Sequence, residues 1–209
     1  MRRGRRAYYN AFSKFYDRFV ALHSGDKQGL ARRFLADQIP GGVGSSILDL
    51  CTGTGSLLPH IQSAVGPHGK TVGVDFSHGM LKAAREKTRK LENVYLVEAD
   101  AGVLPFPAHT FDTITCSHAF YELKGETQAK ALEEIVRVLK PHGVFLMMEH
   151  DVPRNRLIRA LFYVRLTLVG SGRAIAFLRQ EQRVLERHFG MVEKIVAPAG
   201  RSKIMRCRK

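Results

Sequence analysis

The sequence has no tryptophan and only three cysteines, Cys51, Cys116 and Cys207. An odd number of cysteines without paired spacing excludes a disulfide framework. No cluster of cysteines and histidines has the spacing of a zinc site, so we expect no metal. No run of about 18 apolar residues is present to cross a membrane as a helix. Apolar residues make up 44% and charged residues 25% of the chain, values that exclude disordered and collagen-like proteins.

Acidic residues are scarce, since 19 aspartates and glutamates stand against 33 lysines and arginines, for a net charge of +14. The excess lies at the two ends of the chain. Residues 1–40 have nine basic and three acidic side chains, residues 41–150 have ten and twelve, and residues 151–209 have fourteen and four. This distribution predicts an anionic partner, such as membrane headgroups, nucleic acid or an acidic ligand, unless the basic residues only keep the protein soluble.

The N-terminal segment begins with a basic run, Arg2 to Arg6, as a signal peptide does. Polar side chains interrupt the residues that follow, so no apolar signal core forms and we expect a cytoplasmic protein. The spacing predicts a helix over residues 8–22 with one aromatic stripe, formed by Tyr8, Phe12, Phe15, Tyr16 and Phe19. This stripe either covers the substrate and cofactor as a lid or packs into the core.

Short apolar strands and amphipathic helices alternate over residues 46–150. The predicted strands cover residues 46–50, 71–74, 94–97, 114–121 and 144–148, and the helices between them cover residues 57–65, 78–90 and 127–139. This alternation predicts an α/β fold with a doubly wound, mostly parallel sheet and helices on both faces.

Further segments flank this alternating region. The expected helices cover residues 25–38, 155–169 and 173–189, and two closing strands cover residues 191–197 and 203–207. The sheet would then have seven strands, the last two forming an antiparallel pair. We therefore divide the chain into an N-terminal helical lid (1–40), a cofactor-binding core (41–150) and a basic helical cap with the closing strands of the same domain (151–209).

Ligands of open α/β sheets bind beyond the carboxyl ends of the strands. The turn after the first strand contains Gly53 and Gly55, which let the backbone approach a ligand closely. Asp75 ends the second strand about 20 residues further on, where a carboxylate accepts hydrogen bonds from ribose hydroxyls. Asp100 follows the third strand and could accept from an adenine amino group. Together these residues predict a cofactor that contains a nucleoside.

A departure from the dinucleotide fingerprint indicates which cofactor this is. Leu58 stands where the third glycine of G-x-G-x-x-G belongs, so a pyrophosphate is not expected on the helix N-terminus. Asp49, just before the turn, suits a cationic ligand. S-adenosylmethionine has a sulfonium and an ammonium group and no phosphate, so we predict it in preference to a nicotinamide dinucleotide.

Residues 46–150 resemble the class I S-adenosylmethionine-dependent methyltransferases. Four motifs occur in order: ILDLCTGTGSLLPHI, TVGVDFSHGMLKAAREK, VEADAGVLPFPAHTFDTITCSHAFYEL and ALEEIVRVLKPHGVFLMME. The resemblance implies a Rossmann-like methyltransferase fold. It also implies that the cofactor is lined by Asp49, Cys51, Thr52, Gly53 and Gly55 at the methionine end, by Asp75 at the ribose, by Phe76, Met80, Asp100 and Ala101 at the adenine, and by Ser117. Members of this family often have glycine at the position of Cys51.

Within this superfamily, the chain is most similar to the small enzymes that methylate quinone precursors and phospholipid head groups. Tyr16-Asp17-Arg18-Phe19 resembles their N-terminal YD motif, whose segment folds over the cofactor, and Tyr16 is therefore expected at the cofactor. The resemblance implies direct methyl transfer to a small lipophilic acceptor, a quinone-ring carbon or a lipid amine.

Four residues are candidates for a general base, because acceptors approach the methyl group near the ends of the fourth and fifth strands. They are His118, Tyr121, Glu122 and His150, and Asp151 competes with His150 at the end of the fifth strand. Each could instead be structural, since a sulfonium leaves as a neutral thioether and methyl transfer can proceed through proximity and exclusion of water alone.

Basic and apolar residues mix in the segment 155–169, and four further arginines follow in 173–187. This pattern predicts peripheral contact with an anionic membrane surface, unless the segment is a buried core or dimer helix. We expect a monomer or a homodimer. Two alternative functions stay open. A nucleic-acid methyltransferase would suit the charge but lacks an Asn-Pro-Pro-Tyr-type motif at residues 117–120, and a non-catalytic cofactor-binding partner protein would bind without turnover.

Overall fold

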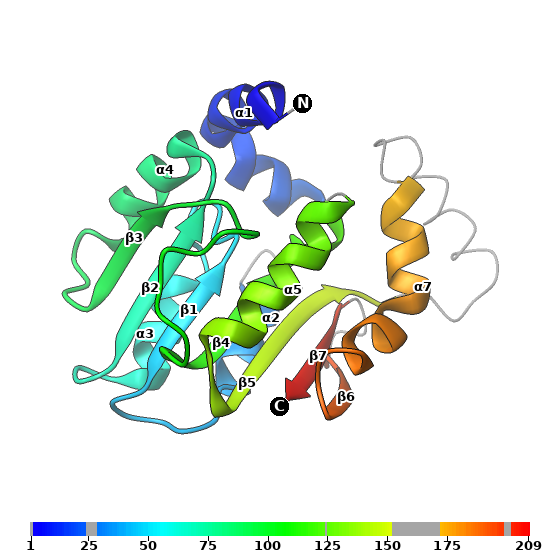
Figure 1. Cartoon of the computed structure of the whole chain (residues 1–209). Coiled ribbons are helices and arrows are strands. Elements are labelled where there is room, and N and C mark those ends of the chain that lie inside the picture. The colour runs from blue at the N-terminus through cyan, green and yellow to red at the C-terminus, as the bar shows by residue number, and fades with distance from the viewer. Residues whose placement is uncertain (1, 24–28, 124, 152–171, 199–201) are drawn as a thin grey trace.

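A seven-stranded sheet with the order β3-β2-β1-β4-β5-β7-β6 forms the centre of the computed structural model (Figure 1). The structure describes residues 2–23, 29–123, 125–151, 172–198 and 202–209. The strands are β1 (Ser46–Leu50), β2 (Lys70–Asp75), β3 (Val94–Glu98), β4 (Phe111–Ser117), β5 (Leu139–His150), β6 (Met191–Val196) and β7 (Ser202–Arg208). The predicted α/β fold with seven strands is therefore confirmed.

The strand directions place a binding crevice at the middle of the sheet. β1 lies between β2 and β4 and is parallel to both, so the chain order reverses on either side of it. Ligands of such sheets bind at this reversal, beyond the carboxyl ends of the strands. β7 runs antiparallel to both β5 and β6, as expected for the closing pair.

Helices cover both faces of the sheet. The helices are α1 (Arg2–His23), α2 (Leu30–Asp37), α3 (Leu58–Val65), α4 (His78–Thr88), the short 3₁₀ helix η1 (Phe120–Glu122), α5 (Glu126–Val138) and α7 (Gly172–Glu186). α5 and α7 pack into one apolar cluster with β4 and β5, while α2 and α3 pack into a second cluster on the other face. α1 lies across the carboxyl ends of the strands, at the top of Figure 1.

Some boundaries differ from the sequence expectation. α1 begins at Arg2 rather than residue 8, because the basic residues before residue 8 are also helical. β5 begins at Leu139 rather than residue 144, since Leu139 pairs with Phe111 and a register shift carries the expected Pro-His-Gly turn into the strand. The helix expected at 155–169 and the beginning of the one expected at 25–38 lie outside the described residues. Among the helices that the structure describes, none is long and apolar enough to cross a membrane.

Candidate active site

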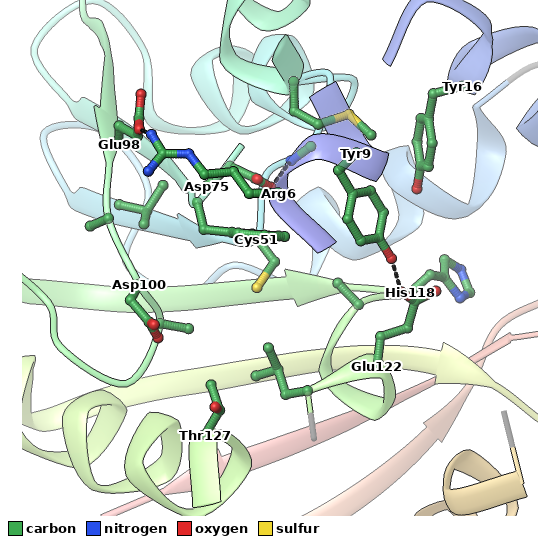
Figure 2. A pocket seen from close by; sticks show the side chains of 18 residues that line it. Arg6, Tyr9, Tyr16, Cys51, Asp75, Glu98, Asp100, His118, Glu122 and Thr127 are labelled. Carbon is green, nitrogen blue, oxygen red and sulfur yellow. Dashed lines mark hydrogen bonds and ion pairs between the residues drawn. The ribbon is translucent and has the colours of Figure 1, made fainter. Parts of the chain in front are cut away.

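A cavity of about 370 Å³ lies between α1 and the carboxyl ends of β1, β2 and β4 (Figure 2). Ten of the sequence-predicted site residues line it: Tyr16, Cys51, Gly53, Asp75, Phe76, Met80, Asp100, Ala101, His118 and Glu122. Six others do not: Asp49, Thr52, Gly55, Ser117, Tyr121 and His150. The structure thus brings the predicted nucleoside end and part of the predicted acceptor end to one cavity.

The two glycines of the turn after β1 have different structural roles. A Cβ on Gly53 would meet no atom within 4 Å, so this residue leaves open space beside the cavity. A Cβ on Gly55 would lie 2.8 Å from the Cβ of Ala84, so this glycine lets α4 pack closely. Both have positive φ, and Cys51 also has a φ of 57°, the left-handed region that favours glycine. Cys51 therefore adopts the glycine-like backbone of its position and directs a thiol to the cavity.

Asp75 is held as a rigid acceptor at the end of β2. Its two carboxylate oxygens accept hydrogen bonds from the backbone N–H groups of Gly53 and Ser77, each at 2.9 Å. Burial raises the pKa of Asp75 to about 6, although these backbone bonds oppose the shift. A carboxylate has roughly four acceptor positions. The acceptor capacity that its backbone partners leave suits the hydroxyls of a ribose.

An apolar slot continues from Asp75 toward the end of β3. Phe76 and Met80 line one part of it, and Ala101 and Asp100 line another. The Asp100 carboxylate accepts a hydrogen bond from the N–H of Gly102 at 2.9 Å, which fixes its direction. An apolar space with a carboxylate at its edge suits an adenine ring and its amino group.

Asp49 lies behind the turn and not in the cavity. It is 2% exposed, and its carboxylate accepts from the hydroxyls of Thr52 at 2.6 Å and Thr115 at 2.7 Å. Burial raises the pKa of Asp49 to about 6, while the two hydroxyls oppose the shift. We expected Asp49 to contact a cationic ligand, but its side chain does not line the cavity. Asp49 and Thr52 shape the turn instead.

The other end of the cavity presents Glu122, which η1 positions. The Tyr9 hydroxyl of α1 donates a hydrogen bond to the Glu122 carboxylate, as Figure 2 shows. Beneath η1, Glu149 accepts from the N–H groups of Phe120 at 3.0 Å and Tyr121 at 3.3 Å. Burial raises the pKa of Glu149 well above its usual range, although the two N–H groups of η1 oppose the shift, and this wholly buried residue anchors η1.

His118 lies next to Glu122 with unusual geometry. Its φ is 52°, its ring centroid lies 4.6 Å from that of His150, and its Nδ1 has no hydrogen-bond partner among the described residues. Burial, and then the neighbouring His150, lowers the pKa of His118 to about 3. The ring is therefore neutral near pH 7 and a weak base. Burial also raises the pKa of Tyr121, which keeps that phenol protonated.

Sequence reasoning missed four polar residues of the lining: Arg6, Tyr9, Glu98 and Thr127. Arg6 on α1 forms an ion pair with Glu98 at the end of β3. The sequence did contain a signal for Arg6 and Tyr9. Both recur at helical spacing with Tyr16, which was predicted at the cofactor, so the three residues share one face of α1. The ion pair between Arg6 and Glu98 could not be predicted from the sequence, because it joins segments that are distant in the chain.

Two side chains of α1 dock this helix onto the cofactor-side elements. The Asn10 amide oxygen accepts from the Ser77 hydroxyl at 2.7 Å and from the N–H of Gly79 at 2.9 Å. Asp17 pairs with Lys87 of α4 at 2.7 Å and accepts from the Thr54 hydroxyl at 2.7 Å. α1 therefore lies over the cavity in a defined register.

The predicted aromatic stripe of α1 does not form one buried face. Tyr16 lines the cavity, and burial raises its pKa to about 12. Tyr8 and Phe15 are exposed, so packing into the core is wrong for these two. Nothing is described for the side chain of Phe19.

The charges of the cavity differ from those of the whole protein. Among the described residues that line it, four are carboxylates (Asp75, Glu98, Asp100 and Glu122) and one is basic, Arg6. Because Arg6 is paired with Glu98, the lining offers little to a phosphate and favours a cation. The sulfonium and ammonium groups of S-adenosylmethionine fit this lining, whereas a diphosphate does not.

Comparison with known proteins agrees with this geometry. The sequence model of the ubiE/COQ5 methyltransferase family matches residues 5–187. Demethylmenaquinone methyltransferase from Staphylococcus haemolyticus is 31% identical over 181 residues, which is 86% of this chain and 75% of the relative. The Staphylococcus aureus enzyme of the same name is 32% identical, with 86% of this chain and 74% of the relative covered.

Solved structures share the fold at lower identity. A SAM-dependent methyltransferase from Aquifex aeolicus has a TM-score of 0.61 at 22% identity, covering 84% of this chain and 88% of the other. A putative O-methyltransferase from Nostoc punctiforme has a TM-score of 0.74 at 15% identity, covering 96% of this chain and 60% of the other. These two similarities concern the fold.

Proposed function

Since the chain belongs to the ubiE/COQ5 methyltransferase family, we propose that this S-adenosylmethionine-dependent methyltransferase methylates a ring carbon of a lipophilic quinone precursor. The demethylmenaquinone methyltransferases at 31% and 32% identity support this choice of acceptor over a phospholipid amine or a nucleic acid. The observation that carries the proposal is Glu122, a carboxylate held by Tyr9 at the end of the cavity away from Asp75 (Figure 2).

The cavity divides into a cofactor part and an acceptor part. Asp75 would accept the ribose hydroxyls, Asp100 the adenine amino group, and Phe76 with Met80 would pack on the adenine ring. When bound, S-adenosylmethionine supplies an electrophilic methyl group on a sulfonium that leaves as a neutral thioether. α1 covers this space and excludes water, which favours transfer to the acceptor over hydrolysis.

A hydroquinone must lose one proton for the methyl group that it gains. Its ring carbon becomes a better nucleophile when a ring hydroxyl is deprotonated. Among the four candidate bases, Glu122 is the carboxylate that faces the cavity, and Tyr9 orients it. His118 also lines the cavity, but its lowered pKa suits a neutral hydrogen-bonding role toward a ring oxygen. We therefore assign the role of general base to Glu122.

A labelled-methyl assay tests the proposed function. Labelled S-adenosylmethionine is offered with a demethylated quinol that has an isoprenoid tail, with phosphatidylethanolamine vesicles, and with RNA in parallel. We expect label in the quinol, and a Glu122→Gln variant should lower kcat by about a hundredfold or more with cofactor affinity unchanged. Glu126→Gln is the matched control, because this exposed carboxylate lies outside the cavity lining. Label in the phospholipid or the RNA alone would refute the proposed acceptor.

A further inference from the structure

α1 differs from an ordinary surface helix because large aromatic side chains face water on its outer side. A helix that covers a globular protein turns its apolar side inward and its polar side to water. On α1, the outward positions are Ala7, Tyr8, Ala11 and Phe15, all of them exposed. The side that faces the protein carries Asn10 and Asp17, which bond to α4 and to the turn after β1, and it also carries Tyr9 and Tyr16, which line the cavity.

This orientation is set by close contacts. A Cβ on Gly79 would lie 2.7 Å from the Cα of Asn10, so α1 and α4 touch backbone to backbone at this glycine. The pairing of Asp17 with Lys87 fixes the helix two turns further on. Rotating α1 to hide its apolar side would break these contacts. The apolar side therefore stays outward.

The outward side carries a strip of exposed apolar residues. Tyr8 is 59% exposed and Phe15 is 62% exposed, and their spacing of seven residues places them two turns apart on one face. The ring of Tyr8 stacks on that of Phe12 with 5.4 Å between centroids, which extends the strip. Two large aromatic side chains that are exposed two turns apart on one helix face indicate a surface that meets a partner.

The charge of the same segment selects the class of partner. Residues 2–18 contain six basic residues and one acidic residue, Asp17. Two such helices would repel each other, which opposes a second copy of this chain as the partner. Basic residues together with exposed aromatic rings on one amphipathic helix are typical of binding in the plane of an anionic lipid surface.

We propose that the outer side of α1, formed by Ala7, Tyr8, Ala11 and Phe15, docks on an anionic membrane surface. The opposite side of the same helix supplies Arg6, Tyr9 and Tyr16 to the cavity. Docking therefore places the cavity directly beneath the lipid surface, where an acceptor with a long apolar tail resides. The delivery of such an acceptor to the cavity rests on the proposed function, whereas the docking itself is inferred from the exposed residues of α1.

The absence of tryptophan from the sequence allows a direct test on the full chain. A Phe15→Trp variant places a single reporter on the proposed surface, and Tyr95→Trp on β3 places one at another exposed site. Vesicles of phosphatidylglycerol and phosphatidylcholine are added without cofactor or acceptor. We expect a blue shift and quenching by brominated lipid for Phe15→Trp alone, and both effects should weaken with added salt. An equal response of the two reporters, or none from Phe15→Trp, overturns the proposal.

A second pair of variants tests the contribution of the aromatic rings. Tyr8→Ser combined with Phe15→Ser should weaken vesicle binding at least tenfold in a flotation assay. Tyr95→Ser combined with Met191→Ser removes comparable exposed apolar surface elsewhere and should leave binding unchanged. Neither pair lines the cavity, so both should bind S-adenosylmethionine as the unchanged protein does. Unaltered vesicle binding by the first pair would refute the proposed surface.

Other partners of this surface give distinct results. If the unchanged protein is a dimer in sedimentation, does not bind vesicles, and becomes monomeric in the Tyr8 and Phe15 variant, the surface belongs to a second copy. If it binds single-stranded RNA through these residues and ignores vesicles, the partner is a nucleic acid. Either result overturns membrane docking. Because no acceptor is present in these assays, their outcome is independent of the labelled-methyl assay.

Discussion

Replacing Asp75 with alanine should weaken binding of S-adenosylmethionine without unfolding the protein. The carboxylate accepts backbone N–H bonds from Gly53 and Ser77 and retains acceptor capacity for a ribose hydroxyl. A hydrogen bond to a charged group contributes about 1.5–3 kcal/mol, but water can enter the space that alanine leaves. We therefore expect a net loss of about 1–3 kcal/mol, which corresponds to a 5- to 150-fold higher Kd.

The pH dependence of cofactor binding gives the same prediction a second readout. Burial raises the pKa of Asp75 to about 6, so the group is protonated below that pH in the absence of cofactor. Hydroxyl donors favour the ionised carboxylate, and its proton must therefore leave before they bind. Affinity should rise by roughly tenfold between pH 5 and pH 7 in the unchanged protein, and this rise should be lost in Asp75→Ala. The pKa of Asp49 is also raised, mainly by its burial, and Asp49 is present in both proteins.

Titration calorimetry at several pH values measures both effects. The matched control is Asp112→Ala, because this carboxylate also accepts a backbone N–H, that of Ser46 at 2.9 Å, but lies outside the cavity. It should leave the Kd and its pH dependence unchanged. An Asp75→Ala Kd within twofold of the unchanged protein would refute the assignment of Asp75 to the ribose. So would a rise of affinity with pH that persists in the variant.

Three further changes test how the site and the fold are held. Tyr9→Phe should lower kcat by about tenfold and leave the cofactor Kd unchanged, because it removes the hydroxyl that orients Glu122; a cofactor Kd that rises equally would contradict this. Gly79→Ala should loosen α1, since its Cβ would clash with the α1 backbone, and faster proteolytic cleavage within α1 at an unchanged melting temperature of the core is the expected result. Lys203→Met should cost about 3–5 kcal/mol of unfolding free energy, because the buried Glu181 loses its ion-pair partner; a loss below about 1 kcal/mol in urea unfolding would contradict it.

The cavity lining and the protein as a whole have opposite charge, and each charge suits a different kind of ligand. The cavity lining is acidic among the described residues and suits a cationic cofactor. The chain as a whole has a net charge of +14, which attracts anionic partners to the outside. Net charge alone would have favoured a phosphate-containing ligand in the cavity. The local arrangement of carboxylates decides otherwise.

Local patterns were enough to predict the sheet and to predict that Asp75 and Asp100 lie together at its edge. Apolar strands alternate with amphipathic helices, and the period of each pattern depends only on neighbouring residues. Asp75 and Asp100 follow the second and third strands, and parallel strands bring their carboxyl ends to one edge. The positions of these residues at the cavity could therefore be read without knowing how the helices pack.

Only the tertiary structure separated Asp49 from Asp75. Both stand at the carboxyl side of neighbouring strands, and both are buried carboxylates. Thr115 on β4 covers Asp49, while the space beside Asp75 stays open to the cavity. This difference depends on which side chain of an adjacent strand points toward each carboxylate, and the register between strands is not encoded in the spacing of either motif.

Contacts of α1 were also decided in three dimensions. The bond between Tyr9 and Glu122 joins residues 113 positions apart, and the sequence predicted a role for Glu122 without its partner. Helical periodicity shows which side chains of α1 share a face, but it does not show what that face meets. Here hydrogen bonds to α4 and to the turn after β1 fix the rotation of the helix, and this rotation leaves Tyr8 and Phe15 exposed to solvent.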